Sequence, residues 1–369
     1  MKKTLLITLD FWPNHGGVAN YYYNLCKNLP KKDIFILTNV KKEDSQLKII
    51  NKKLLYKFFW PHWTRAYQET LKVIKENKIQ KLWVGNLLPL GTVAYLIYKK
   101  HQIPYFVSLH GLDILNALKN KRKKLLAKKI LKHAQFITVN SNCTKNLLKD
   151  LVKNQEKIKI IYPGVNLNFQ KINEQKLSEI KNKYNPNNKK IILTTGRLVK
   201  RKNHELVIKA IKKLAQKIPN LVYLIIGNGP EKKNYGLRIK NYGLQNNIKI
   251  LTNINNEELP YFYKLSDIFI MVSKTSPEDI EGFGIVYLEA GLFKKPVIAS
   301  NQGGSKEAVI NNQTGILIND NLAELKQAII KLLNNSELRN QLGNNAEQRI
   351  QKTFLWPEIS KKLIKYINE

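Results

Sequence analysis

Short apolar runs alternate with amphipathic stretches along the whole chain. In the first half, the apolar runs predict buried strands, and the stretches between them repeat their apolar positions with the spacing of helices. The strands predicted for this half are Thr4–Leu9, Ile34–Thr38, Lys81–Val84, Tyr105–Leu109 and Phe136–Val139. Strands that alternate with helices are typical of a parallel sheet, so this half is predicted to form an α/β domain.

The same alternation starts again after a polar interval. The clearest break is the cluster Asn185-Pro186-Asn187-Asn188, so a linker is expected near residues 165–190. The strands predicted beyond it are Ile191–Thr195, Leu221–Ile226, Lys249–Leu251, Ile268–Val272 and Pro296–Ala299. The chain is predicted to be helical from Leu322, and its last helix is amphipathic. The pattern therefore indicates two doubly wound α/β domains.

Length and composition agree with two ordinary domains. The 369 residues exceed the roughly 250–300 at which a single hydrophobic core stops growing. Hydrophobic residues make up 43% and charged residues 24% of the chain, which excludes collagen-like and broadly disordered proteins. Cys26 and Cys143 cannot form a disulfide framework, so a reducing, cytoplasmic location is favoured.

The apolar segments do not predict membrane insertion. The first apolar run ends at Asp10, before the core of a signal peptide would be complete, so it is interpreted as a strand. The long uncharged stretch from Leu82 to Tyr98 is interrupted by Gly85, Pro89 and other loop-forming residues. No transmembrane segment is expected.

The net charge requires an anionic partner or a compositional cause. There are 63 Lys and Arg against 27 Asp and Glu, a formal charge of +36. Only seven of the 63 are Arg, so 56 are Lys, and this bias explains part of the excess. Residues 1–170 hold 31 basic and 9 acidic residues, or +22, so the first half is better suited to an anionic surface. A non-catalytic nucleic-acid-binding protein is one alternative, although no nucleic-acid motif is evident.

Two features of the first half lie where strands are predicted to end. Gly16 and Gly17 follow the first strand and open a helix, so bare backbone could approach an anion there, or the pair could simply form a tight turn. His110 ends another strand, at the edge where open α/β sheets bind ligands. A single histidine can equally have a structural role.

The second half offers a pair of cations at the same kind of edge. Arg197 follows a predicted strand and Lys202 opens the next helix. A guanidinium fork and a compact ammonium together suit a diphosphate. Basic residues are so common in this chain that a solvated surface is the alternative. Asn203 follows Lys202 and tolerates left-handed backbone, which favours a loop of defined conformation over a solvated surface.

The segment from Glu281 to Glu289 is the most informative. Gly282 and Gly284 precede an apolar helix, so free backbone amides and the positive helix end are expected to face one point. The two carboxylates suggest neutral hydroxyl groups as partners, such as those of a sugar and a ribose. A capping and a surface glutamate are the alternative.

Other cofactor motifs are missing from the sequence. Gly227-Asn228-Gly229-Pro230 lacks the third glycine of a dinucleotide fingerprint. No phosphate-loop or nucleophile-elbow motif occurs. There is no Asp-x-Asp pair, and the six histidines are too scattered for a zinc site. We expect neither a metal nor a cofactor.

Taken together, these segments resemble the group 1 family of retaining glycosyltransferases with the GT-B fold, which includes the phosphatidylinositol mannosyltransferases. The resemblance covers nearly the whole chain. It is carried by Gly16-Gly17-Val18, His110-Gly111, Pro163-Gly164-Val165-Asn166, Gly196 to Lys202, Gly227-Asn228-Gly229-Pro230, Glu281 to Val286 with Glu289, and Pro296-Val297-Ile298-Ala299 before Gly303-Gly304.

The resemblance implies two Rossmann-like domains that face each other across a cleft. The N-terminal domain would hold the acceptor and span residues 1–168, joined by a returning C-terminal helix at 353–369. The C-terminal domain, residues 169–352, would hold the nucleotide sugar. A phosphorylase of the same architecture is a further alternative, but no lysine segment for pyridoxal phosphate is recognisable.

The resemblance also implies a role for each site residue. Arg197 and Lys202 would neutralise the diphosphate, with Gly16 and Gly17 approaching it. Glu281 would hold the donor sugar. The remaining donor contacts implied are backbone amides of Phe283, Gly284 and Ile285, with Val286 beside them, Glu289 at the ribose, and His110 near the reacting carbon.

The same family implies a metal-independent reaction with no dedicated general base. The sequence of residues 279–286 most resembles that of the mannosyl-transferring members, so GDP-mannose is the expected donor and a UDP-sugar is the alternative. Asn203, Thr252 and Lys294 stand where the family often has glycine, so the identity of the donor's nucleotide base is left open.

The acceptor is expected to be a lipid-linked molecule or a glycan. Residues 52–63 interleave aromatic and basic side chains, and residues 119–132 form a basic amphipathic stretch with Leu125, Leu126, Ile130 and Leu131. Both suggest peripheral docking on the inner face of the cytoplasmic membrane through anionic lipid. A solvated basic face with an aromatic core segment is the alternative.

Overall fold

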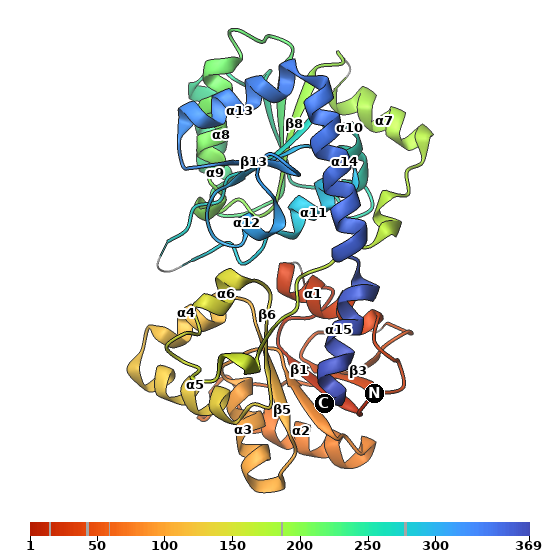
Figure 1. Ribbon diagram of the computed structural model, residues 1–369, viewed down its shortest axis with the longest axis vertical. Coiled ribbons are helices and arrows are strands. Elements are labelled where there is room, and N and C mark those ends of the chain that lie inside the picture. Colours follow the sequence, from red (N-terminus) through yellow and green to blue (C-terminus); the bar gives the residue numbers. More distant parts are fainter. Residues whose placement is uncertain (15, 42–43, 59, 186, 277–278) are drawn as a thin grey trace. The chain divides into compact units, whose positions relative to one another are not determined.

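A computed structural model describes residues 1–369 except 15, 42–43, 59, 186 and 277–278. The contacts divide the chain into two compact units, each built on one parallel sheet (Figure 1). The first unit comprises Met1–Gly164, residues 279–282 and Trp356–Glu369, and the second comprises Val165–Ser276 and Phe283–Leu355. Within the described part of the chain, no helix is both long and apolar enough to cross a bilayer.

The first unit is a doubly wound sheet of seven parallel strands in the order β3-β2-β1-β4-β5-β6-β7. Its strands are β1 (Thr4–Thr8), β2 (Ile34–Thr38), β3 (Lys48–Asn51), β4 (Lys81–Val84), β5 (Tyr105–Leu109), β6 (Ile137–Val139) and β7 (Ile158–Ile160). Its helices are α1 (Gly17–Lys27), α2 (Thr64–Asn77), α3 (Leu90–His101), α4 (Leu112–Leu118), α5 (Lys121–His133), α6 (Asn142–Asn146), the short η1 (Gln155–Lys157) and α15 (Trp356–Asn368).

The central strands are apolar throughout because both faces of the sheet are covered. In β1, Leu5 and Ile7 join a core with α2, α3 and α5, whereas Leu6 joins a second core with α1 and α15. Successive residues of a strand point to opposite faces, so a strand between two helical layers needs an unbroken apolar run.

The C-terminal helix α15 completes the second of these cores. It packs against α1 through an apolar stripe that includes Ile359 and Leu363. The fully buried ammonium of Lys81 donates a hydrogen bond of 2.5 Å to the carbonyl oxygen of Ile367, in the last turn of the helix. The helix therefore returns to the first unit, as the resemblance implied.

The second unit is a sheet of six parallel strands in the order β10-β9-β8-β11-β12-β13. Its strands are β8 (Lys190–Thr195), β9 (Leu221–Ile226), β10 (Ile248–Leu251), β11 (Ile268–Met271), β12 (Val297–Ser300) and β13 (Gly315–Ile318). Its helices are η2 (Leu167–Gln170), α7 (Glu174–Tyr184), η3 (Lys200–Lys202), α8 (His204–Leu214), α9 (Lys232–Asn241), α10 (Leu259–Leu265), α11 (Ile285–Leu292), α12 (Ser305–Ala308), α13 (Leu322–Asn334) and α14 (Ser336–Thr353). In Figure 1, α8, α9 and α13 cover one face of this sheet, and α10, α11 and α14 lie on the other.

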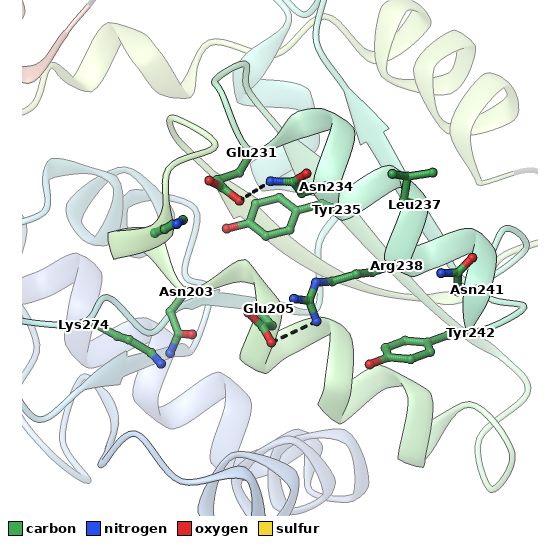
Figure 2. A pocket seen from close by; sticks show the side chains of 11 residues that line it. Asn203, Glu205, Glu231, Asn234, Tyr235, Leu237, Arg238, Asn241, Tyr242 and Lys274 are labelled. Carbon is green, nitrogen blue, oxygen red and sulfur yellow. Dashed lines mark hydrogen bonds and ion pairs between the residues drawn. The ribbon is translucent and has the colours of Figure 1, made fainter.

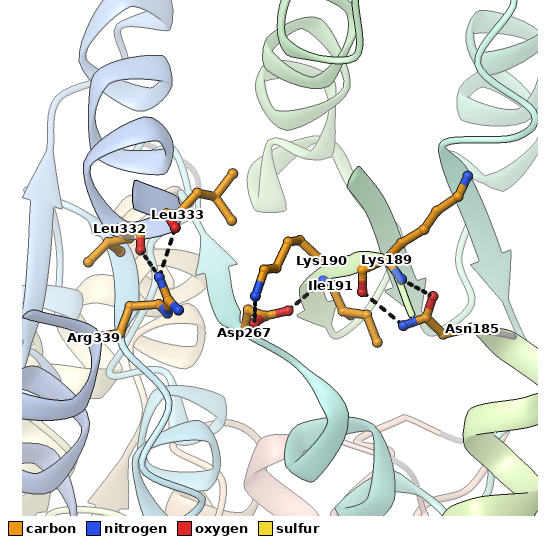
Figure 3. A network of polar contacts seen from close by, with 8 residues as sticks. All are labelled: Asn185, Lys189, Lys190, Ile191, Asp267, Leu332, Leu333 and Arg339. Carbon is orange, nitrogen blue, oxygen red and sulfur yellow. Dashed lines mark hydrogen bonds and ion pairs between the residues drawn. The ribbon is translucent and has the colours of Figure 1, made fainter. Parts of the chain in front are cut away.

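Polar side chains close the amino-terminal edge of this sheet (Figure 3). Asp267, just before β11, accepts a hydrogen bond of 2.8 Å from the backbone amide of Ile191 in β8. The side chain of Asn185 bonds both the amide and the carbonyl of Lys189, each at 2.9 Å. Arg339 donates to two carbonyl groups in the last turn of α13. These contacts give hydrogen-bond partners to backbone groups at this edge. In open α/β sheets the ligand binds at the opposite, carboxyl edge, between the loops that follow the strands.

The α/β class and the two doubly wound sheets predicted from the sequence are confirmed. Each of the ten predicted strands coincides with an observed strand to within one residue at either end. The sequence prediction missed β3, β7 and β13, all of which are edge strands. An edge strand is covered on fewer sides and carries fewer apolar residues, so its pattern is weaker.

The linker expected near 165–190 is wrong for most of its length. The stretch contains η2 and α7, and α7 begins at a capping Asn173, whose side chain accepts from the amide of Lys176 at 3.0 Å. Ile180 anchors α7 in the second unit. Pro186, in the predicted break, lies outside the described residues. The unit boundaries fall after Gly164 and before Trp356 rather than at 168 and 353.

Candidate functional site

The second unit has its topological switch point at β8. The chain continues from β8 to β9 on one side, whereas β11 pairs with β8 on the other. At such a point the loops after the two central strands diverge, and they leave a crevice at the carboxyl edge of the sheet. The segments predicted to bind a donor in this unit follow β8 and β11.

The loop after β8 carries Arg197 and Lys202. The Arg197 side chain is exposed to solvent. The ammonium of Lys202 lies 3.1 Å from the sulfur of Met271, the last residue of β11. Asn203 follows in the left-handed region at φ 53° and donates 2.9 Å to the carboxylate of Asp320. The loop therefore brings one cation across the switch point to the end of β11.

The amino terminus of α11 approaches the same methionine. Gly284, which precedes α11, has φ 92°, and a β-carbon there would lie 2.3 Å from the ring of Tyr287. Only glycine fits this turn. The hydroxyl of Tyr287 donates 2.8 Å to the carbonyl oxygen of Met271, and the β-carbon position of Gly284 is 3.4 Å from the Met271 methyl group.

A cation and a helix amino terminus thus meet at one residue of the sheet edge. The first amides of a helix lack intrahelical acceptors, and the helix dipole places partial positive charge there. Ile285 and Val286, in the first turn of α11, are half-buried. The arrangement of the Lys202 ammonium beside these amides suits an anionic group such as a phosphate.

Glu289, one turn further along α11, is oriented by a chain of hydrogen bonds between hydroxyl groups. The hydroxyl of Tyr263 on α10 donates 2.7 Å to a carboxylate oxygen of Glu289 and lies 2.7 Å from the hydroxyl of Thr195 at the end of β8. Burial raises the pKa of Glu289 above its ordinary value. The second oxygen of a carboxylate held in this way can accept from a ligand hydroxyl.

Tyr263 and Thr195 were not among the predicted site residues. Tyr263 is buried within the aromatic helix α10, and its sequence pattern is that of a core residue. Thr195 is the polar end of a buried strand. The only available signal was the position of Thr195 at a strand end.

The loops after β8 and β9 touch each other at a glycine. A β-carbon on Gly227, where φ is 144°, would lie 1.9 Å from the carbonyl oxygen of Gly196. The amide of Leu198 donates 2.9 Å to the carbonyl oxygen of Asn228. The Gly-Asn-Gly-Pro segment thus supports the loop that carries Arg197, in keeping with its rejection as a dinucleotide fingerprint.

In the first unit, His110 lies at the end of β5 against two tyrosines. Its Nε2 is 2.9 Å from the hydroxyl oxygen of Tyr22, and that hydroxyl donates 2.8 Å to the carbonyl oxygen of Gly85. Because the single Tyr22 proton is used there, Nε2–H of a neutral His110 is the donor between the two. Burial lowers the pKa of His110 to about 3, so the ring is neutral at physiological pH.

The turn after His110 is organised by Asp113. One carboxylate oxygen accepts from the amides of His110, Gly111 and Ile114 at 3.2, 3.1 and 3.0 Å. Burial raises the pKa of Asp113 to about 6. The carboxylate therefore fixes the backbone that presents the imidazole.

The remaining predicted residues of the first unit lie in two loops. Gly16 and Gly17 are exposed at the start of α1, with open space where β-carbons would stand. Glu281 is only 8% exposed and lies in residues 279–282, which group with the first unit. The prediction had placed Glu281 in the same domain as Arg197 and Lys202.

The family models match both halves of the chain. Residues 176–349 match the model described as glycosyl transferases group 1, and residues 15–169 match glycosyltransferase family 4. An uncharacterized glycosyltransferase of Methanocaldococcus jannaschii is 31% identical over 361 residues, which cover 95% of this chain and 94% of the relative. The chain belongs to the group 1 glycosyltransferases.

Other similar proteins show the range of this family. A GDP-mannose-dependent alpha-(1-6)-phosphatidylinositol monomannoside mannosyltransferase of Mycobacterium tuberculosis is 22% identical over 382 residues, covering 100% of this chain and 98% of that one. The crystal structure of Anabaena HepE in complex with UDP and glucose matches with a TM-score of 0.85 at 19% identity, covering 100% of both chains. The GT-B fold and an enzymatic role are therefore confirmed.

Two residues that stand where the family often has glycine adopt the backbone conformation that glycine favours. Asn203 and Lys294 have φ of 53° and 56°, in the left-handed region. Side chains there cost roughly 1–2 kcal/mol per residue. The glycosyltransferase thus retains both turns without glycine.

The second unit of the glycosyltransferase brings together Lys202, Gly284 with the start of α11, and Glu289. Phe283 is buried beside them and packs on Phe354, with ring centroids 5.6 Å apart. His110, Gly16, Gly17 and Glu281 belong to the first unit. The roles of these residues toward a donor stay predictions.

The neutral state of His110 has a measurable consequence for stability. Its pKa is lowered from 6.5 to about 3, so below pH 6.5 the unfolded chain binds a proton that the folded chain refuses. The contribution of His110 to the free energy of unfolding therefore falls as the pH decreases from 6.5 towards 3. We expect the His110→Gln variant to lose less stability on acidification, by about 2 kcal/mol at about pH 5.

Urea unfolding of both proteins across this range measures the difference. Asp113, whose pKa is raised, contributes in the opposite direction but is present in both proteins. Parallel stability curves for the two proteins would show that His110 is protonated in the folded state.

Proposed function

We propose that this glycosyltransferase moves a hexose from a nucleoside diphosphate sugar to an acceptor hydroxyl, with retention of the anomeric configuration and without a metal. The observation that carries the proposal is the meeting of the Lys202 ammonium and the amino terminus of α11 at Met271. Positive groups at this edge are suited to the diphosphate of a donor.

The proposed reaction breaks the bond between the anomeric carbon and the diphosphate oxygen. Arg197 and Lys202 stabilise the negative charge as it develops on the leaving group, which lowers the barrier more than it strengthens donor binding. The acceptor oxygen forms the new glycosidic bond on the same face, and its proton passes to the departing phosphate. No side chain is assigned as general base.

The other donor contacts follow the family pattern. The backbone amides of Phe283, Gly284 and Ile285, with Val286 beside them, and the carboxylate of Glu281 would hold the sugar. Gly16 and Gly17 would approach the diphosphate. His110, neutral and donating its single N–H to Tyr22, would present its other ring nitrogen, Nδ1, as an acceptor near the reacting carbon of the sugar. An imidazolium there would oppose an oxocarbenium-like charge.

We take GDP-mannose as the donor, with a UDP-sugar as the second candidate. The mycobacterial relative named for GDP-mannose, which aligns with the whole of this chain, supports the first. The HepE structures with UDP and UDP-glucose support the second.

Replacing Arg197 by alanine tests the leaving-group role. We expect hydrolysis or transfer of the donor to slow by roughly 100- to 1,000-fold, the effect of removing one donor of about 2.7–4 kcal/mol at a developing charge. Turnover of GDP-mannose, UDP-glucose and UDP-N-acetylglucosamine is measured with and without EDTA.

The matched control is Arg122→Ala, which removes an exposed guanidinium from α5. A loss below tenfold for Arg197→Ala would place that side chain away from the leaving group. Loss of turnover in EDTA would exclude the metal-independent reaction.

Replacing Tyr263 by phenylalanine tests whether Glu289 binds the ribose. The substitution removes the 2.7 Å bond to Glu289 but keeps the ring in the core. We expect KM for the donor to rise about tenfold, or 1.4 kcal/mol, while kcat changes little.

A donor with deoxyribose in place of ribose separates positioning from folding. The preference of the wild-type enzyme for ribose should shrink in Tyr263→Phe. An unchanged preference with a uniformly weaker activity would mean that Tyr263 has only a structural role.

We further propose that the acceptor is lipid-linked or a glycan and that the enzyme docks peripherally on an anionic cytoplasmic membrane. The structure distinguishes the two predicted segments. In α5, Ile130 and Leu131 are fully buried in the first unit's core, and Leu125 alone of the four predicted apolar residues is strongly exposed, at 62%. The amphipathic face of α5 is therefore occupied.

Residues 52–63 are the better candidate for membrane contact. Phe58 is 100% and Trp60 80% exposed, next to several lysines. Phe59 lies outside the described residues. Exposed aromatic side chains beside cations suit the interface of an anionic membrane.

A double variant, Phe58→Ser with Trp60→Ser, tests this docking by flotation with liposomes. Wild-type enzyme is expected to bind vesicles that contain phosphatidylserine, and the variant at least tenfold less, because burying each aromatic side chain contributes about 1.5–3 kcal/mol. Leu167→Ser, an exposed leucine of the second unit, is the control. Equal binding to anionic and neutral vesicles would overturn the proposal.

A further inference from the structure

A cleft of about 740 Å³, lined by polar and apolar groups, lies in the second unit, on the side of α8 and α9. One wall is the exposed face of α9, and the other is formed by the start of α8 and by η3 (Figure 2). The helix contributes Asn234, Arg238 and Asn241, and the residues that flank it, Glu231 and Tyr242, also line the cleft. Their spacing of three, four and seven residues places them along one side of the helix.

Four of the five charged side chains that line the cleft have a polar partner. Arg238 bridges to Glu205 of α8 at 3.1 Å, as Figure 2 shows. Glu231 accepts 3.0 Å from the amide group of Asn234. Lys274 pairs with Asp320 at 3.0 Å. The fifth is Lys200, so the lining holds three cations against two carboxylates, and Asp320, outside the lining, balances Lys274. In a chain of net charge +36 this is a nearly neutral region, and an anion entering it would meet the carboxylates of Glu205 and Glu231.

The cleft offers alternating hydrogen-bond donors and acceptors beside small apolar surfaces. Amide, guanidinium and carboxylate groups can each bond to more than one hydroxyl. The ring of Tyr242 and the side chain of Leu237, which is 52% exposed, supply apolar contacts. A volume in the range of ordinary ligand sites, about 300–1,000 Å³, accommodates a short chain of sugar rings.

We propose that this cleft binds a neutral oligosaccharide at a site separate from the donor crevice between β8 and β11. Hydroxyl groups match its donors and acceptors, whereas an anion would be repelled by the carboxylates of Glu205 and Glu231. The binding itself does not depend on which donor the enzyme uses.

The cleft also adjoins the loop that carries Lys202. Lys200 and Asn203, on either side of that lysine in the chain, line the cleft, and the amide of Lys274 donates 2.7 Å to the carbonyl oxygen of Arg201. A glycan held here therefore lies beside the segment that reaches Met271. The cleft would retain a glycan substrate or product close to the donor site.

Isothermal titration of the full-length enzyme, without nucleotide sugar, tests the proposal. The probes are mannobiose, mannopentaose, maltose and maltopentaose, with inorganic phosphate as the anionic comparison. At least one sugar series is expected to bind, the longer member more tightly than the shorter, and phosphate is not expected to compete. Failure of all four sugars to bind, or displacement of the sugar by phosphate, would overturn the proposal.

The double variant Asn234→Ala with Asn241→Ala locates the binding. Both side chains are exposed, so their removal leaves the core of the unit unchanged. Affinity should fall at least tenfold, whereas Lys233→Ala with Lys240→Ala, also exposed on α9 but outside the cleft lining, should bind like wild type. Equal affinity of the asparagine variant and wild type would exclude this cleft.

Donor hydrolysis of the same variants keeps this inference distinct from the proposed function. Without oligosaccharide, the asparagine variant should hydrolyse the donor as wild type does. Sugar binding by an enzyme that turns over no nucleotide sugar would refute the proposed function and leave the cleft assignment intact. Turnover of the nucleotide sugar without oligosaccharide binding would refute the cleft assignment and leave the proposed function intact.

Discussion

The arrangement of the second unit depends on one constraint, the change of strand order between the neighbouring parallel strands β8 and β11. Because the loops after these strands part, the ammonium of Lys202 can reach across to Met271, and the first amides of α11 can approach from the other side. Gly284 makes this approach possible, since a side chain there would collide with Tyr287. Fixed positive groups at such an edge need no rearrangement when negative charge develops.

Each unit holds charged or neutral polar groups in defined states near the ends of its strands. Lys202 is a cation at the sheet edge, while Glu289 is a carboxylate whose pKa is raised by burial and whose orientation depends on Tyr263. In the first unit His110 is kept neutral by burial and fixed by Tyr22. The large net charge of the chain therefore says little about these groups, whose states depend on burial and on individual hydrogen-bond partners.

Membership of the group 1 glycosyltransferases explains the fold and the class of reaction but not the substrates. Relatives named for GDP-mannose and structures holding UDP share this architecture with the present chain. One fold supports many donors and acceptors, since specificity resides in the side chains of individual loops. The exposed aromatic residues Phe58 and Trp60 and the cleft along α9 are the features for which we propose such roles.

The sequence alone determined the α/β class, ten of the strands and the glycine and cation motifs, because buried runs and tight turns constrain nearby residue types. It could not identify edge strands such as β3, or recognise α7 within a polar stretch. Only the tertiary structure decided that Ile130 and Leu131 face a core, that Tyr263 holds Glu289, and that residues 279–282 group with the first unit. These outcomes depend on contacts between residues far apart in the chain, which local patterns of polarity do not encode.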